Sequence, residues 1–90
     1  MMNKYPTEEE LKKIEEWPHD DFKGLMDFIY DLWEYADSGY WVQKRKKYYI
    51  STAGWSGNED IISALEKNWT FWMMCWQQSK RGGHYIFHVT

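Results

Sequence analysis

The sequence contains one cysteine, two prolines and no long hydrophobic run. Because Cys75 has no second cysteine to pair with, we expect no internal disulfide and a reducing, cytoplasmic location. The apolar runs fall short of the roughly 20 residues that cross a bilayer, so we expect no contact with a membrane. Residues 1–6 lack the apolar stretch of a signal peptide. No established catalytic motif occurs, and we predict a protein that is not an enzyme and holds no cofactor or metal.

The chain is instead rich in aromatic side chains, which make up 20% of its 90 residues and include seven tryptophans. This surplus argues against disorder, because disordered chains lack the bulky side chains that build a core. A length of 90 residues fits one folded domain, to which we assign residues 1–90. So small a domain has limited room to bury this many rings, which leaves a homodimer open.

The net charge of −3 hides an uneven division along the chain. Residues 1–37 hold eleven acids and four lysines, a net −7, whereas residues 38–90 hold three acids and seven bases, a net +4. Two structural explanations are that the halves attract each other, or that the acids form the solvated face of a helix. The functional explanation is that the basic part binds an anion while the acidic part limits nonspecific binding of nucleic acid.

Apolar periodicity predicts two helices in the acidic third. A capping-box pattern at residues 7–10 begins the first helix, and Pro18 ends it. Asp20 or Asp21 can cap the second helix, for which the Ser-Gly pair at 38–39 is a plausible end. Its apolar face consists of Phe22, Leu25, Met26, Ile29, Trp33 and Ala36.

Strand-forming residues begin after the second helix. Residues 40–43 and 47–52 are rich in aromatic and β-branched side chains, and the basic run 44–47 between them predicts a hairpin with a basic tip. A third helix is predicted after the glycine-containing loop that follows, with Ser56 or Asn58 as its cap.

Residues 70–78 are apolar on both alternating faces up to Gln77, which favours a central strand. Apolar pairs at helical spacing leave a helix open for this segment. Residues 80–83 are typical of a hairpin turn, and residues 84–89 alternate as a strand does. The predicted order is therefore α-α-β-β-α-β-β, an α+β fold in which helices pack on one face of a four-stranded antiparallel sheet.

Two loops with glycines are the best candidate for a binding site. The first leads from a strand into a helix, whose N-terminal amides and dipole favour an anion. The second adds two cations, two glycines and an imidazole. If both lie at one end of the sheet, they can hold a phosphate while Trp55 stacks on a base. The candidate ligand-binding residues are Gly54, Trp55, Ser56, Gly57, Asn58, Lys80, Arg81, Gly82, Gly83 and His84. The structural alternative is that each loop needs glycine for its backbone geometry alone.

The other aromatic residues divide into expected core and expected surface. We assign Trp33, Trp69, Trp72 and Trp76 to the core, whereas Trp55 is placed either in a ligand contact or as a plug at the sheet end. Aromatic residues also lie beside the basic run 44–47, a combination that suits single-stranded nucleic acid. They are Trp41, Tyr48 and Tyr49.

Catalytic chemistry finds little support. Ser56 lies in a pattern similar to the nucleophile elbow, but Asn58 stands where that motif needs glycine. Cys75 lies among apolar residues, which predicts an inert buried thiol. His84 and His88 share one strand face but lie about 13 Å apart, too far to bind one metal ion.

Three segments together resemble small uncharacterised proteins encoded by bacteriophages and prophages. They are the loop 54–59, the tryptophan-rich segment 71–76 and the turn 81–85, and the resemblance covers roughly residues 40–88. It implies a phage origin and expression in a bacterial cytoplasm, and it implies no established activity. Small phage proteins often bind and disable a host component.

These observations support three hypotheses of function. The first is a protein that binds a small phosphate-bearing ligand, for which a nucleotide is the best candidate. Its role would be to sequester a host nucleotide signal. The second is an inhibitor or adaptor that binds a host protein through its acidic helical face. The third is a single-stranded nucleic-acid binder, against which the net charge of −3 argues.

Overall fold

The computed structural model describes residues 5–89, so the expectation about a signal peptide in residues 1–6 lies largely outside the described chain. The elements in chain order are α1 (Glu8–Glu15), α2 (Phe22–Leu32), the short 3-10 helix η1 (Ala36–Ser38), β1 (Trp41–Lys44), β2 (Lys47–Ser51), α3 (Ser56–Lys67), α4 (Trp69–Cys75), β3 (Trp76–Lys80) and β4 (His84–His88).

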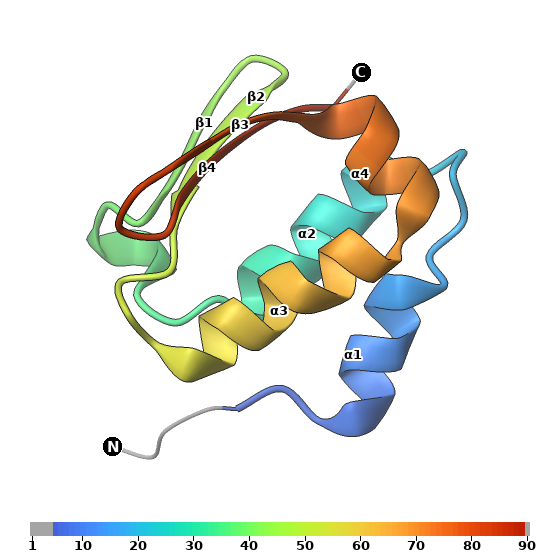
Figure 1. The fold of residues 1–90 in the computed structure, drawn as a ribbon, viewed down its shortest axis with the longest axis horizontal. Coiled ribbons are helices and arrows are strands. Elements are labelled where there is room, and N and C mark those ends of the chain that lie inside the picture. Colours follow the sequence, from blue (N-terminus) through green and yellow to red (C-terminus); the bar gives the residue numbers. More distant parts are fainter. Residues whose placement is uncertain (1–4, 90) are drawn as a thin grey trace.

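The four strands form one antiparallel sheet in the order β1-β2-β4-β3. Figure 1 shows the helices on one side of this sheet, with α2 and α3 nearer to it and α1 beyond them against α3. The two hairpin turns lie at opposite ends of the sheet. The predicted α+β fold is thus confirmed, because both hairpins and the helical layer are present.

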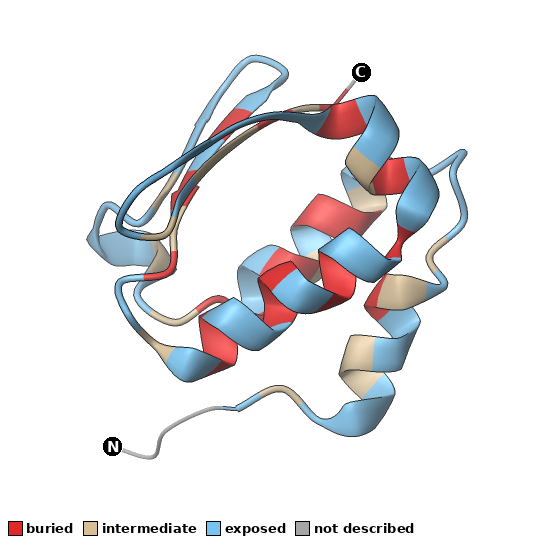
Figure 2. Cartoon of the chain, viewed as in Figure 1, coloured by how far each residue is buried: buried red, intermediate tan, exposed pale blue. Residues whose placement is uncertain are grey.

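The core lies between the sheet and the helices. Alternate residues of the central strands, Tyr48 and Ile50 in β2 and Phe87 in β4, are buried against the helical layer. Figure 2 shows buried residues along α2 and α3, whereas the edge strands β1 and β3 are mostly exposed. None of the helices within residues 5–89 is long and apolar enough to cross a membrane.

The capping predictions for the first two helices are confirmed. The Thr7 side chain accepts from the Glu10 amide at 3.1 Å, and the Glu10 carboxylate accepts from the Thr7 amide at 2.9 Å. Asp21 is the residue that caps α2, since its carboxylate accepts from the Gly24 amide at 3.2 Å.

The second helix ends earlier than its periodicity predicts. It stops at Leu32, and Trp33 is extended, because Glu34 finds its partners elsewhere. The Glu34 amide donates to the Asn58 side chain at 2.9 Å, and the Asn58 amide group donates back to the Glu34 carbonyl at 3.0 Å. A distant side chain thereby replaces the helical hydrogen bonds that Glu34 would otherwise make.

The predicted strand over residues 70–78 is wrong in its first part. Residues Trp69–Cys75 form α4, and the strand begins only at Trp76. Asn68 caps this helix, because its side chain accepts from the Phe71 amide at 3.2 Å. The same side chain donates to the Ile14 carbonyl at 2.9 Å, which ties α4 to the end of α1. Burial at helical spacing follows, with Phe71 and Cys75 both inside.

The assignment of four tryptophans to the core is half correct. Trp33 is buried and Trp72 half-buried, but Trp69 is 72% exposed and Trp76 40% exposed. Because the segment is helical, Trp69 points away from the face that buries Phe71. The homodimer that the aromatic surplus left open stays a prediction.

Candidate functional site

The two glycine loops lie side by side at one end of the sheet. The Thr52 amide donates to the Gly83 carbonyl at 3.0 Å, and the Ser51 hydroxyl is hydrogen-bonded to Nδ1 of His84 at 2.6 Å. The condition on which the sequence-based site depended, that both loops share one end, is therefore met. Gly54, Gly82 and Gly83 all have positive φ angles, so backbone geometry alone also accounts for these glycines.

The first loop is largely occupied by contacts within the chain. Trp55 is half-buried, and its ring stacks on Tyr5 with 4.9 Å between centroids. The Tyr5 ring also lies close to Gly57 at the start of α3, and the Ser56 hydroxyl donates to the Tyr5 hydroxyl at 3.3 Å. The two rings thus lie beside the N-terminus of α3, where the sequence analysis placed the anion.

The start of α3 also differs from the predicted capping. The helix begins at Ser56, the Trp55 side chain forms no cap hydrogen bond, and Asn58 lies buried in the first turn. Instead of capping, the Asn58 side chain bridges Glu34 and the Thr52 carbonyl, the latter at 3.3 Å. Gly57 is buried as well. The hydrogen bonds of the Asn58 side chain thus hold the loop in place from inside.

The second loop borders the face of the sheet that no helix covers, which we call the open face. The strand register shows that the open face consists of three rows of outward-facing residues. The first row across the strands is Lys80, His84 and Ser51. The middle row is Gln78, Ile86, Tyr49 and Val42. The third row is His88, Lys47 and Lys44.

A hollow of about 310 Å³ lies on the open face at the end where the two loops meet. Lys80, His84 and Ser51 line it from the first row, and Tyr49 with Ile86 from the middle row. Its size falls at the lower end of the range for small-molecule sites. Of the ten predicted site residues, Lys80 and His84 line this hollow, whereas none of residues 54–58 does.

The hollow combines three kinds of contact that suit a phosphate ester of a ring compound. Lys80 supplies a cationic head group, and the Ser51–His84 pair supplies polar groups that hydrogen-bond. The Tyr49 ring is 38% exposed and offers a face for stacking. Arg81 follows Lys80 in the exposed turn, within the same loop.

Acidic residues are absent from the sheet and its turns. Residues 39–58 and 67–89 contain no aspartate or glutamate, and the three acids of the basic part all belong to α3. Six of the seven bases of that part lie in the strands or hairpin turns: Lys44, Arg45, Lys46, Lys47, Lys80 and Arg81. The register puts Lys44, Lys47 and Lys80 on the open face, which is therefore cationic although the whole chain is not.

Sequence reasoning missed Ser51 and Ile86 as site residues, and it assigned Tyr49 to the surface beside the basic run 44–47 and not to the loop site. Their alternation in β2 and β4 was a usable signal, because residues two apart in a strand share a face. The same alternation places Tyr48 on the opposite face, where it is buried. Trp41 packs there as well, 5.9 Å from the Tyr48 ring, so of the three aromatics beside the basic tip only Tyr49 reaches the open face.

Cys75 is buried, as the sequence predicts, and burial raises the pKa of its thiol to about 11. No group of three or more metal-ligating side chains occurs within residues 5–89.

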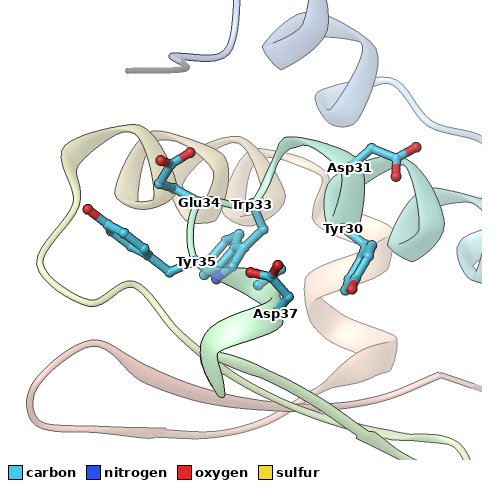
Figure 3. Close-up of a pocket in the computed structure, with 7 residues that line it drawn as sticks. Tyr30, Asp31, Trp33, Glu34, Tyr35 and Asp37 are labelled. Carbon is cyan, nitrogen blue, oxygen red and sulfur yellow. The ribbon is translucent and has the colours of Figure 1, made fainter. Parts of the chain in front are cut away.

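A second hollow, of about 410 Å³, lies on the helical side where α2 runs into η1. It is lined by Tyr30, Asp31, Trp33, Glu34, Tyr35 and Asp37, whose side chains Figure 3 shows. Tyr35 has a positive φ of 65°, which turns the chain between Glu34 and η1. Three carboxylates and two exposed tyrosines give this hollow an acidic and aromatic lining, opposite in charge to the open face.

Comparison with known proteins finds no matching family model, no matching curated protein and no matching solved structure.

Proposed function

We propose that this protein binds a phosphate-bearing ligand with an aromatic ring, best a nucleotide, in the hollow on the open face. The observation that carries the proposal is the convergence of Lys80, His84 and Tyr49 on one hollow. Phosphate would lie against Lys80 and the Ser51–His84 pair, and the base would stack on Tyr49. In the phage setting that the sequence resemblance implies, the ligand would be a host nucleotide signal that the protein sequesters in the bacterial cytoplasm.

Thermal melts against mono-, di- and cyclic nucleotides test the proposal. A ligand at one hundred times its Kd adds about 2.7 kcal/mol to the free energy of unfolding, which shifts the Tm measurably. We expect at least one nucleotide to raise the Tm at millimolar concentration. Absence of a shift with every member of the panel would contradict the proposal.

Variants locate the binding in the hollow. Lys80→Ala and Tyr49→Leu should each reduce nucleotide affinity while the Tm without ligand changes little, because both side chains are exposed. Lys12→Ala removes an exposed lysine from α1 on the helical side and is the matched control. If Lys12→Ala weakened binding as much as Lys80→Ala, the effect would be one of overall charge and the hollow would not be the site.

The acidic hollow favours a second candidate, the binding of a basic segment of a host protein. Glu34 and Asp37 supply carboxylates for lysine or arginine, and Tyr30 and Tyr35 supply rings for cation–π contacts. A lysine-rich peptide should bind the unaltered protein more tightly than the double variant Glu34→Gln, Asp37→Asn. Glu9→Gln on α1 is the control, and equal binding by all three proteins would dismiss this candidate.

A further inference from the structure

The cations of the open face occupy two separate rows with an apolar row between them. Lys80 lies in the first row, and Lys44 and Lys47 lie in the third. Residues two apart in a strand are separated by about 7 Å, which puts the outer rows about 13 Å apart. A single phosphate bound at the first row therefore leaves the lysines of the third row without an anionic partner in the ligand.

We propose that the open face binds single-stranded nucleic acid, whose backbone crosses from the row of Lys80 to the row of Lys47. This inference rests on the proposed function, because the hollow beside Lys80 holds one nucleotide of the chain. The next phosphates then reach Lys44 and Lys47, and the middle row faces the bases. A repeating anion with a base on every unit matches two cationic rows separated by an apolar one.

Charge complementarity supports this ligand against the net charge of the protein. The strands and turns hold six cations and no acid, so a phosphate backbone on the open face meets no carboxylate from these segments. The acids lie in the helices or in the segments that join them, and Figure 1 shows the helices on the other side of the sheet. Local charge decides affinity for nucleic acid, because binding depends on the cations that contact phosphates.

The side chains of the middle row favour a single-stranded nucleic acid over a duplex. Tyr49 and Val42 are each more than one third exposed, and Ile86 is half-buried between them and Gln78. Unpaired bases have faces that stack on such a surface, whereas the bases of a duplex are already stacked on one another. Contact with a duplex would use the lysines alone.

Fluorescence polarisation with a labelled ten-nucleotide oligo(dT), the corresponding duplex and thymidine monophosphate as competitor tests the inference. We expect the oligonucleotide to bind at least tenfold more tightly than the mononucleotide. Its affinity should fall with salt, with a log–log slope of about −2 for three phosphates neutralised. The duplex should bind at least tenfold more weakly than the single strand at the same salt concentration.

Two sets of variants divide the surface. Lys44→Ala combined with Lys47→Ala should weaken oligonucleotide binding about tenfold and leave the mononucleotide Tm shift unchanged. Tyr49→Leu should weaken oligonucleotide binding about tenfold. Tyr49→Phe, which keeps the ring, should bind the oligonucleotide as tightly as the unaltered protein does. Lys12→Ala combined with Lys23→Ala removes two lysines from the helices and should change little.

The outcomes separate this inference from the function on which it rests. If the mononucleotide binds but the oligonucleotide binds no better, and the Lys44, Lys47 variant is unaffected, the inference is wrong and the proposed function stands. If neither the mononucleotide nor Lys80→Ala has any effect while the oligonucleotide binds, the hollow is not a site and both proposals are wrong. Equal affinity for duplex and single strand would overturn the inference alone.

Discussion

The Thr52 amide donates a hydrogen bond to the Gly83 carbonyl at 3.0 Å, and this contact joins the loop after β2 to the turn before β4. The backbones approach so closely that a Cβ atom at Gly83 would collide with the Thr52 hydroxyl. Gly83 also has a φ of +80°, a conformation that costs other residues about 1–2 kcal/mol. Gly83→Ala should therefore lower the free energy of unfolding by more than about 2 kcal/mol, measured by urea denaturation.

Gly54→Ala is the matched control for this prediction. Gly54 has a similar φ of +71°, but a Cβ atom there would meet nothing within 4 Å. Gly54→Ala should therefore lower the free energy of unfolding by about 1 kcal/mol, which is the cost of the positive φ alone. Equal losses in the two variants would mean that the contact between Thr52 and Gly83 adds nothing beyond the backbone strain.

Asn58→Ala should destabilise the protein although Asn58 is polar and lies near a helix end. Its side chain makes hydrogen bonds to the Glu34 amide, the Glu34 carbonyl and the Thr52 carbonyl, and it is fully buried. Removal leaves these backbone groups without partners, for a loss of about 2–3 kcal/mol in the free energy of unfolding. Ser56→Ala, two residues earlier and exposed, should cost less than about 0.5 kcal/mol. A small loss in Asn58→Ala would show that water replaces the amide.

Local patterns predicted the fold wherever neighbouring residues determine it. The capping box at Thr7, the cap at Asp21 and the basic hairpin tip depend on residues close in sequence, and all three are present. The end of α2 at Leu32 depends instead on Asn58, which lies 24 residues after Glu34. Periodicity within the helix carries no information about so distant a partner.

The candidate site was predicted only in part, because some of its residues are brought together by pairing between distant segments. Composition and glycine spacing identified the loop with Lys80 and His84, both of which line the hollow. Tyr49 and Ser51 complete it only because β2 pairs with β4, a long-range pairing that the two separate hairpins left open. The cap that Asn68 provides for α4 was equally hidden, since its other partner is the distant Ile14.

The helical assignment of residues 69–75 makes a sharp prediction for two neighbouring aromatic residues. Phe71 is fully buried and packs on Phe22 and Phe87, whereas Trp69 is 72% exposed. Phe71→Ala should lower the free energy of unfolding by about 3–5 kcal/mol. Trp69→Ala should cost less than about 1 kcal/mol, because little of its surface is buried. In a strand these residues would share a face, so comparable losses in both variants would contradict the helix.

Cys75 should make the stability of the protein depend on alkaline pH. Burial raises the pKa of its thiol from the ordinary 9.0 to about 11, so the folded protein holds this proton over a pH range in which the unfolded chain releases it. The thiol's contribution is fully present below pH 9 and is lost as the pH rises to about 11, for a decrease of about 2 kcal/mol in the free energy of unfolding.

The comparison that isolates this effect is Cys75→Ala, measured by urea denaturation from pH 8 to pH 11. The variant loses buried contacts at every pH, but the additional decrease above pH 9 should be smaller than in the unaltered protein. Burial also raises the pKa of Tyr48 and Tyr85, and both tyrosines remain in the variant, so their contribution cancels in the difference. Parallel pH profiles for the two proteins would show that the Cys75 thiol ionises as readily in the folded protein as in the unfolded chain.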